Sequence, residues 1–172
     1  MSRIASLMLA SLLLTAACGK SAPLGPEGSH STRPADESLA FARLRTEPYP
    51  FTFNSGLTDS ARVVVRDARA WEAIWRDVWR NHTPVPALPA IDFEREMVVV
   101  AALGSRRSGG YGILVEGATR TAEGVEVSIL KQSPGSRCGN TAAITTPVDI
   151  ARLRRVDGAV RFRERNEVRE CR

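Results

Sequence analysis

Residues 68–81 read ARAWEAIWRDVWRN, and this stretch decides how the chain folds. Its large apolar residues recur at intervals of three and four, which is the period of one face of an α-helix. Glu72 and Asp77 precede arginines by four and three residues, so ion pairs are expected on the solvent face. Asp67 stands before the helix, where its carboxylate can accept from the free amides of the first turn. The apolar stripe consists of Trp71, Ile74, Trp75, Val78 and Trp79.

The three tryptophans of this stripe allow two interpretations. They could form an aromatic platform, with one ring edge exposed in a binding groove. A stripe that also holds isoleucine and valine is more typical of core packing, because burial of large rings is the main way in which one helix attaches to a sheet. We therefore expect the helix to cover a sheet, with its tryptophans in the core.

The rest of the chain has the pattern of β-strands. Residues 97–103, MVVVAAL, form an unbroken apolar run that is typical of a strand buried on both faces. Apolar and polar residues alternate most clearly at 125–131 and 160–165. One helix cannot supply several crossover connections, so the strands should be antiparallel. We predict an α+β domain, with a mainly antiparallel sheet of about five to six strands packed by one tryptophan-rich helix. Further strands are expected at 63–65, 111–117 and 143–153, and hairpins at Glu123-Gly124 and Asp157-Gly158.

The stretch GSRRSGGYG, residues 104–112, follows the buried strand and is rich in glycine and arginine. It begins with the G-x-x-x-x-G spacing of a phosphate-binding loop, which would continue with lysine and then serine or threonine. Gly110 and Tyr111 stand there instead, so we expect no nucleotide to bind. We predict a hairpin connection in which Gly109 and Gly110 take positive φ.

The beginning of the chain has the pattern of an export signal. Arg3 precedes a largely apolar stretch, Ile4 to Leu14, that is too short to span a bilayer of roughly 30 Å. The next residues, Thr15-Ala16-Ala17-Cys18, resemble the lipobox of bacterial lipoproteins, although Thr15 stands where leucine is preferred. The resemblance implies that Cys18 carries diacylglycerol and an acyl chain, which would anchor the protein. An ordinary secretory signal with a free thiol is the alternative.

The composition divides the chain into three segments. We predict that residues 1–17 are the lipoprotein signal peptide that the lipobox resemblance implies, residues 18–42 a flexible tether rich in Pro, Gly and Ser, and residues 43–172 one folded domain. Gly19 is not acidic, which favours the outer membrane, on its periplasmic or surface face. We therefore place the protein in the cell envelope.

The net charge is +5, and most of the excess lies near the end of the chain. Residues 152–172 hold eight arginines against four acidic residues, a local balance of +4. A basic surface suggests nucleic acid when other signals join it, but an exported protein meets no chromosome, so no nucleic-acid partner is expected. The arginines between Arg161 and Arg165 are either a contact surface or the solvated face of a strand.

No pattern of catalytic or metal-ligating residues is recognisable. The chain has two histidines, His30 and His82, and no serine or cysteine can be placed beside either from the spacing. We expect no enzyme activity, no metal and no cofactor. Cys138 and Cys171 can form a disulfide in the envelope, provided that their Cα atoms lie within about 7 Å.

Several motifs together resemble the PrcB C-terminal domain family, over about residues 43–171. The family's loop typically reads G-x-R-P-T-G-G-Y, and here Arg107 replaces the proline and Ser108 the threonine. The resemblance implies a lipoprotein accessory subunit that assembles with and stabilises a secreted subtilisin-like protease, and is not itself a protease. The motifs are Arg66-Asp67 before WEAIW, Ile91-Asp92-Phe93 before EMVVVAALG, the SGGY of Ser108–Tyr111, Cys138, and Thr146-Pro147.

Two functional hypotheses follow. The first is a non-enzymatic binding or assembly module on the membrane. The second is a peptidase inhibitor, because the Gly-Tyr turn also resembles the T-T-G-Y loop of chagasin-type inhibitors, which are all-β sandwiches without such a helix. The candidate partner-binding residues are Arg106, Arg107, Gly109, Gly110 and Tyr111, together with the strand Arg161 to Arg165.

Overall fold

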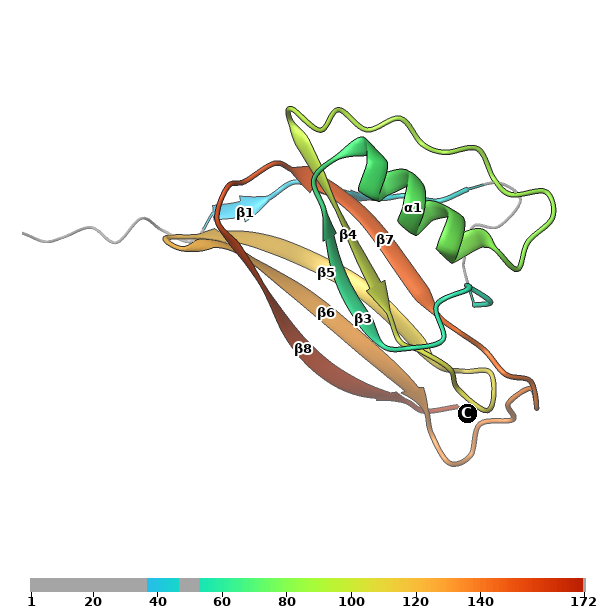
Figure 1. Ribbon diagram of the computed structural model, residues 1–172. Helices are drawn as coiled ribbons and strands as arrows, with labels where there is room; N and C mark the ends of the chain where they lie inside the picture. Colours follow the sequence, from blue (N-terminus) through green and yellow to red (C-terminus); the bar gives the residue numbers. More distant parts are fainter. Residues whose placement is uncertain (1–36, 47–52, 172) are drawn as a thin grey trace, which may run out of the picture. The chain divides into compact units, whose positions relative to one another are not determined.

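The computed structural model describes residues 37–46 and 53–171, which form a helix and two four-stranded sheets in three layers (Figure 1). The central sheet has the order β2-β7-β4-β3, and it lies between α1 and the outer sheet, β1-β5-β6-β8. The elements are β1 (Glu37–Leu39), β2 (Phe41–Arg43), β3 (Ala61–Val65), α1 (Ala68–Trp79), β4 (Glu96–Ala102), β5 (Gly112–Thr121), β6 (Gly124–Pro134), β7 (Val148–Arg154) and β8 (Ala159–Arg169).

The helix α1 forms where the periodicity predicts it. The Asp67 carboxylate accepts a hydrogen bond of 2.8 Å from the amide three residues on, which caps the first turn. On the solvent face Glu72 and Arg76 form the expected ion pair at 3.3 Å. Arg80 instead donates to the backbone carbonyl of Gly56, so it ties the end of the helix to the segment before β3.

The three tryptophans of α1 are buried against the central sheet, which confirms the core interpretation. Their neighbouring ring centroids are 5.1 and 5.5 Å apart, at the tilted angles that aromatic pairs favour. The indole N–H groups of Trp71 and Trp75 donate to the carbonyls of Pro89 and Pro86, each at 3.0 Å. The proline-rich segment after the helix therefore satisfies two polar groups that burial would otherwise leave unpaired.

Strand β4 is buried on both faces, as its unbroken apolar run predicts. It pairs antiparallel with β3 on one side and with β7 on the other. Its side chains alternate between two cores, because successive residues of a strand point to opposite faces. Met97, Val99 and Ala101 pack toward the outer sheet, whereas Val98, Val100 and Ala102 pack against α1.

The α+β class, the mainly antiparallel pairing and the tryptophan-rich helix are confirmed, but eight strands form two sheets where one sheet of about five to six was predicted. Two of the additional strands, β1 and β2, fall largely within the predicted tether. They pair with β5 and β7, so the folded domain begins before residue 43. Residues 1–17 and the rest of the tether lie outside the described residues.

The turn predictions met with different outcomes. Glu123-Gly124 does form the β5–β6 hairpin, with Thr121 opposite Gly124. The hairpin predicted at Asp157-Gly158 is wrong, because β7 belongs to the central sheet whereas β8 pairs parallel with β6 in the outer sheet. The hairpin predicted at 104–112 is wrong for a similar reason, since the strands that it joins, β4 and β5, lie in different sheets.

A disulfide joins Cys138, in the loop after β6, to Cys171, just beyond β8. The two Cα atoms are 5.1 Å apart, inside the range that a disulfide spans. Cys138 Sγ also lies 3.3 Å from the carbonyl oxygen of Arg169. The bond therefore fixes the loop after β6 to the end of the neighbouring strand.

Candidate binding site

The loop 104–111 is held to the chain that precedes β7. The amide of Arg106 donates to the Thr145 carbonyl at 2.8 Å, and the amide of Thr145 donates back to the Arg106 carbonyl at 2.9 Å. The Gly109 amide donates to the Thr141 carbonyl at 2.9 Å. Backbone bonds at both ends of the loop thus position its side chains.

The prediction of positive φ angles in this loop is confirmed for one of its two glycines. Gly110 has a φ of +86°, and a Cβ there would collide with Asn140 Oδ1 and lie 2.9 Å from Pro134 Cβ. Gly109 was predicted to have positive φ as well, but the positive angle falls on Gly104, at +79°. Gly109 donates its amide to Thr141 without a positive φ.

Arg106 and Tyr111 are brought together, with the guanidinium carbon of Arg106 5.8 Å from the Tyr111 ring centroid. This is a cation–π arrangement. Both side chains are half-buried, whereas Arg107 between them in sequence is exposed. Of the two arginines predicted to bind a partner, Arg107 is therefore the exposed one, whereas Tyr111 forms part of a wall.

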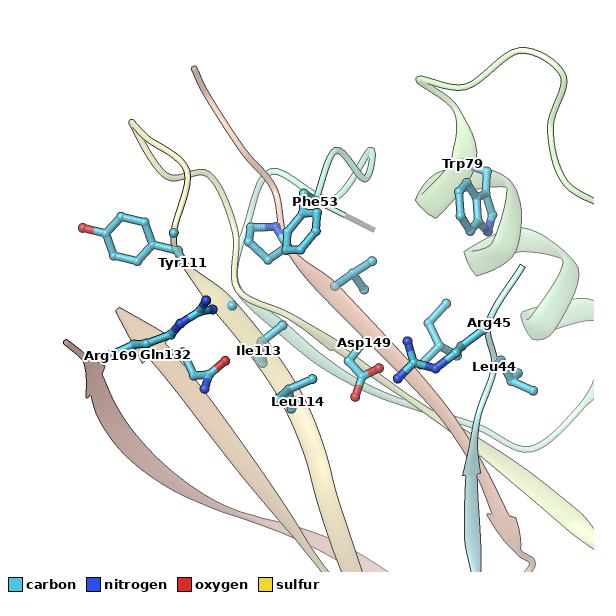
Figure 2. A pocket seen from close by; sticks show the side chains of 15 residues that line it. Leu44, Arg45, Phe53, Trp79, Tyr111, Ile113, Leu114, Gln132, Asp149 and Arg169 are labelled. Carbon is cyan, nitrogen blue, oxygen red and sulfur yellow. The ribbon is translucent and has the colours of Figure 1, made fainter. Parts of the chain in front are cut away.

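That wall encloses a cavity of about 470 Å³ beside the first half of β5. Figure 2 shows Tyr111 at one side of it and Trp79 of α1 at the other. The lining is mostly apolar with a few polar groups, which is the composition of ligand sites. Trp79 is the tryptophan of α1 among the lining residues, and it is nevertheless buried at 2% exposure. The cavity is lined by Leu44, Arg45, Phe53, Trp79, Gly110, Tyr111, Gly112, Ile113, Leu114, Gln132, Pro147, Val148, Asp149, Ile150 and Arg169.

Asp149 is the one carboxylate among these lining residues, and it connects the two sheets. It accepts hydrogen bonds from the Val115 amide at 2.7 Å and from Arg43 Nε at 3.1 Å. Arg43 also donates to the Val115 carbonyl at 2.6 Å. Burial raises the pKa of Asp149, while the bonds from Val115 and Arg43 act in the opposite direction. Asp149 is not among the residues predicted from the sequence, although a single acid between Val148 and Ile150 is a usable signal.

The arginine-rich segment Arg161 to Arg165 lies on β8, and its arginines pair with glutamates of the β5–β6 hairpin. These pairs neutralise much of the local positive charge and favour the solvated-face interpretation over a basic contact surface. The distances are 2.5 Å for Arg161–Glu123, 3.7 Å for Arg163–Glu126 and 2.5 Å for Arg165–Glu116.

Two further observations concern the described residues as a group. In residues 37–46 and 53–171, no three His, Cys, Asp or Glu side chains are gathered as metal ligands would be. Within the same ranges no helix has the length and apolar character that crossing a membrane requires.

Comparison with known families gives one match. Residues 97–154, from β4 to the end of β7, match the family model described as PrcB C-terminal. Comparison with curated proteins and with solved structures gives no match. The matched region contains the loop 104–111, Asp149 and much of the cavity wall. The match is to the family that the motifs of the sequence indicate, and it covers residues 97–154.

Proposed function

We propose that this protein is a non-enzymatic binding module of the bacterial cell envelope that serves as an accessory subunit of a protease complex. The family match at residues 97–154 is the observation that carries the proposal. The structure supports it with an amphipathic cavity and a backbone-held loop at one end of the sheets. The partner that we propose is a secreted subtilisin-like protease, which the subunit stabilises.

We further propose that lipid on Cys18 anchors the protein, at the outer membrane. The support is the lipobox-like sequence alone, since Cys18 lies outside the described residues. Two or three acyl chains would hold the protein firmly, because each buried CH₂ contributes roughly 0.8 kcal/mol. In detergent phase separation we expect the native protein in the detergent phase and Cys18→Ser in the aqueous phase. A Cys18→Ser protein that stayed in the detergent phase would exclude the lipid anchor.

The protease partner is tested by cross-linking in native envelopes, followed by mass spectrometry. The comparison is between the native chain and the double variant Arg106→Ser, Arg107→Ser, with Arg154→Ser as a control at the other end of β7. We expect a protease among the cross-linked proteins, lost in the double variant and retained in the control. Recovery of no protease with the native chain would remove the protease partner from the proposal, and unchanged capture by the double variant would leave the loop an architectural element.

Peptidase inhibition is the second candidate. The observation in its favour is that Gly110 and Tyr111 sit beside a cavity at the end of two packed sheets, where an inhibitory loop would be presented. Assays against papain-like and subtilisin-like peptidases separate the two functions. Sub-micromolar inhibition would favour the inhibitor, and absence of inhibition with retained capture would favour the assembly module.

A further inference from the structure

One edge of β5 is paired along only part of its length. Ala118 and Arg120 of β5 lie opposite Leu39 and Glu37, the last and first residues of β1. The β5–β6 hairpin closes with Thr121 opposite Gly124, so alternate residues of β5 direct their backbone groups toward β6 and toward the free edge. A bulge between Val115 and Gly117 interrupts this alternation. On the other side of the bulge, where β1 does not cover β5, the residues whose backbone groups face the free edge are Val115 and Ile113.

At Val115 side chains take the place of a neighbouring strand. Its amide donates to the Asp149 carboxylate and its carbonyl accepts from Arg43, at 2.7 and 2.6 Å. The same pair of groups on Ile113 faces the edge two residues earlier, and neither is bonded by any residue in 37–46 or 53–171. Ile113 is 3% exposed and lines the cavity. A buried amide and carbonyl without partners are costly, so this position calls for a ligand that supplies both an acceptor and a donor.

The surroundings of Ile113 define the side chains that such a ligand would carry. Leu114 and Val148 contribute apolar side chains to the lining of the cavity. Asp149 is engaged by Arg43, so its charge is already balanced. Arg169 stands at the rim and Arg107 in the adjacent loop, and within the described part of the chain their guanidinium groups form no ion pair. A ligand whose apolar side chains alternate with carboxylates would complement both the apolar lining and the two arginines.

We propose that the edge of β5 at Ile113 accepts an extended peptide segment as an additional strand, with an apolar side chain in the cavity and acidic side chains toward Arg169 and Arg107. Main-chain bonds provide affinity in strand addition, and pockets for alternate side chains provide specificity. An acyl chain would fit the apolar walls but could not bond the amide and carbonyl of Ile113 together. This inference rests on the proposed binding function and names the kind of segment that the partner presents.

The test uses the full-length protein, purified in detergent, and a fluorescein-labelled hexapeptide of alternating valine and glutamate. Binding is followed by fluorescence anisotropy, with a lysine-valine hexapeptide as the charge control. Two further versions of the acidic peptide carry N-methyl groups on alternate residues, one version on the odd-numbered and the other on the even-numbered residues. Each version therefore blocks hydrogen bonding along one edge of the extended peptide. We expect saturable binding of the acidic peptide, none of the basic one, and loss of binding for one methylated register while the other is retained. Absence of saturable binding, or equal behaviour of the two registers, would overturn the proposal.

A second measurement locates the site on the protein. In ¹⁵N-labelled protein, the peptide should protect the Ile113 amide from hydrogen exchange and leave the Val115 amide, already bonded to Asp149, unchanged. Arg169→Glu should weaken peptide binding about tenfold, whereas Arg154→Glu, the same charge change at the far end of β7, should leave it unaltered. An unprotected Ile113 amide, or equal effects of the two substitutions, would place the peptide elsewhere and refute the edge site. If these tests fail while envelope cross-linking still recovers a protease, the strand-addition site is wrong and the proposed function stands.

Discussion

Arg62 of β3 and Glu164 of β8 form an ion pair of 2.6 Å that joins the central and outer sheets along one side. Glu164 also contacts Lys131 Nζ at 2.8 Å. The hydrogen bond from Lys131 is the largest cause that lowers the pKa of Glu164, with Arg62 acting in the same direction and partial burial opposing both. Along the opposite side Asp149 and Arg43, both of the central sheet, join it to the outer sheet by bonding the backbone of Val115 in β5.

Glu164→Gln should reduce the free energy of unfolding at pH 7 by about 1 kcal/mol, because it removes the charge that two cations share. A folded-state pKa below the ordinary 4.5 means that this stabilisation is present above pH 4.5 and is lost as the pH falls through the lowered value. Urea denaturation should therefore show a smaller difference in the free energy of unfolding between the native chain and Glu164→Gln at pH 3 than at pH 7. Glu94→Gln, at an exposed position, is the control. An equal difference at both pH values would contradict the role of the charge.

Asp149→Asn should show the opposite pH dependence. The pKa of Asp149 is raised by burial above its ordinary 3.8, so the native state binds this proton more tightly than the unfolded state. The stability advantage of the native chain over Asp149→Asn should be largest below pH 3.8 and should narrow as the pH rises through the raised value. Thermal unfolding of both proteins across this range measures the effect, and an advantage that widened with pH would show that Arg43 outweighs burial.

Gly110→Ala should destabilise the domain by about 1–3 kcal/mol, because alanine is strained at positive φ. The added methyl group would also meet Asn140 and Pro134. Gly109→Ala is the matched control, since the angle there is ordinary and a Cβ would lie 3.6 Å from Thr141 Cβ, at normal contact distance. Urea unfolding of the two single variants should separate them clearly. Similar losses in both would indicate that the crowding around Gly110 relaxes.

Removal of the disulfide by the double variant Cys138→Ser, Cys171→Ser should lower the free energy of unfolding. The sequence separation is 33 residues, for which the chain-entropy model gives about 3 to 4 kcal/mol. Reduction of the disulfide in the native chain should lower its free energy of unfolding by the same amount as the double substitution does. Unfolding with and without a reductant measures this loss. A native chain that reductant left unchanged, although fully reduced by thiol titration, would mean that the loop after β6 is held by its other contacts.

The elements that the sequence predicts well are those whose signal is local. The Trp-Ile-Val period of α1 and the apolar run of β4 specify both structure and burial, because each pattern is set within one element. Sheet membership is not local, and for that reason Asp157-Gly158 reads as a hairpin although its flanking strands join different sheets. β1 and β2 escape detection because three residues each are too few to show a period.

The candidate site illustrates the same limit. Gly110 and Tyr111 were recognisable from their motif, and both line the cavity. The cavity itself gathers residues from Leu44 to Arg169, which only the packing of two sheets brings together. The unpaired backbone groups of Ile113 leave no trace in composition, because they depend on where β1 leaves the edge of β5.

The parallel pairing of β8 with β6 has a consequence for the order of assembly. Every other strand pair described in the two sheets is antiparallel, and the chain passes through β7 in the opposite sheet before it returns as β8. Without β8, the edge of β6 from Gly124 to Pro134 would be open to pairing with another extended chain. An open strand edge of this length invites intermolecular pairing. We therefore expect the chain to be most prone to aggregation while β8 has not yet paired with β6.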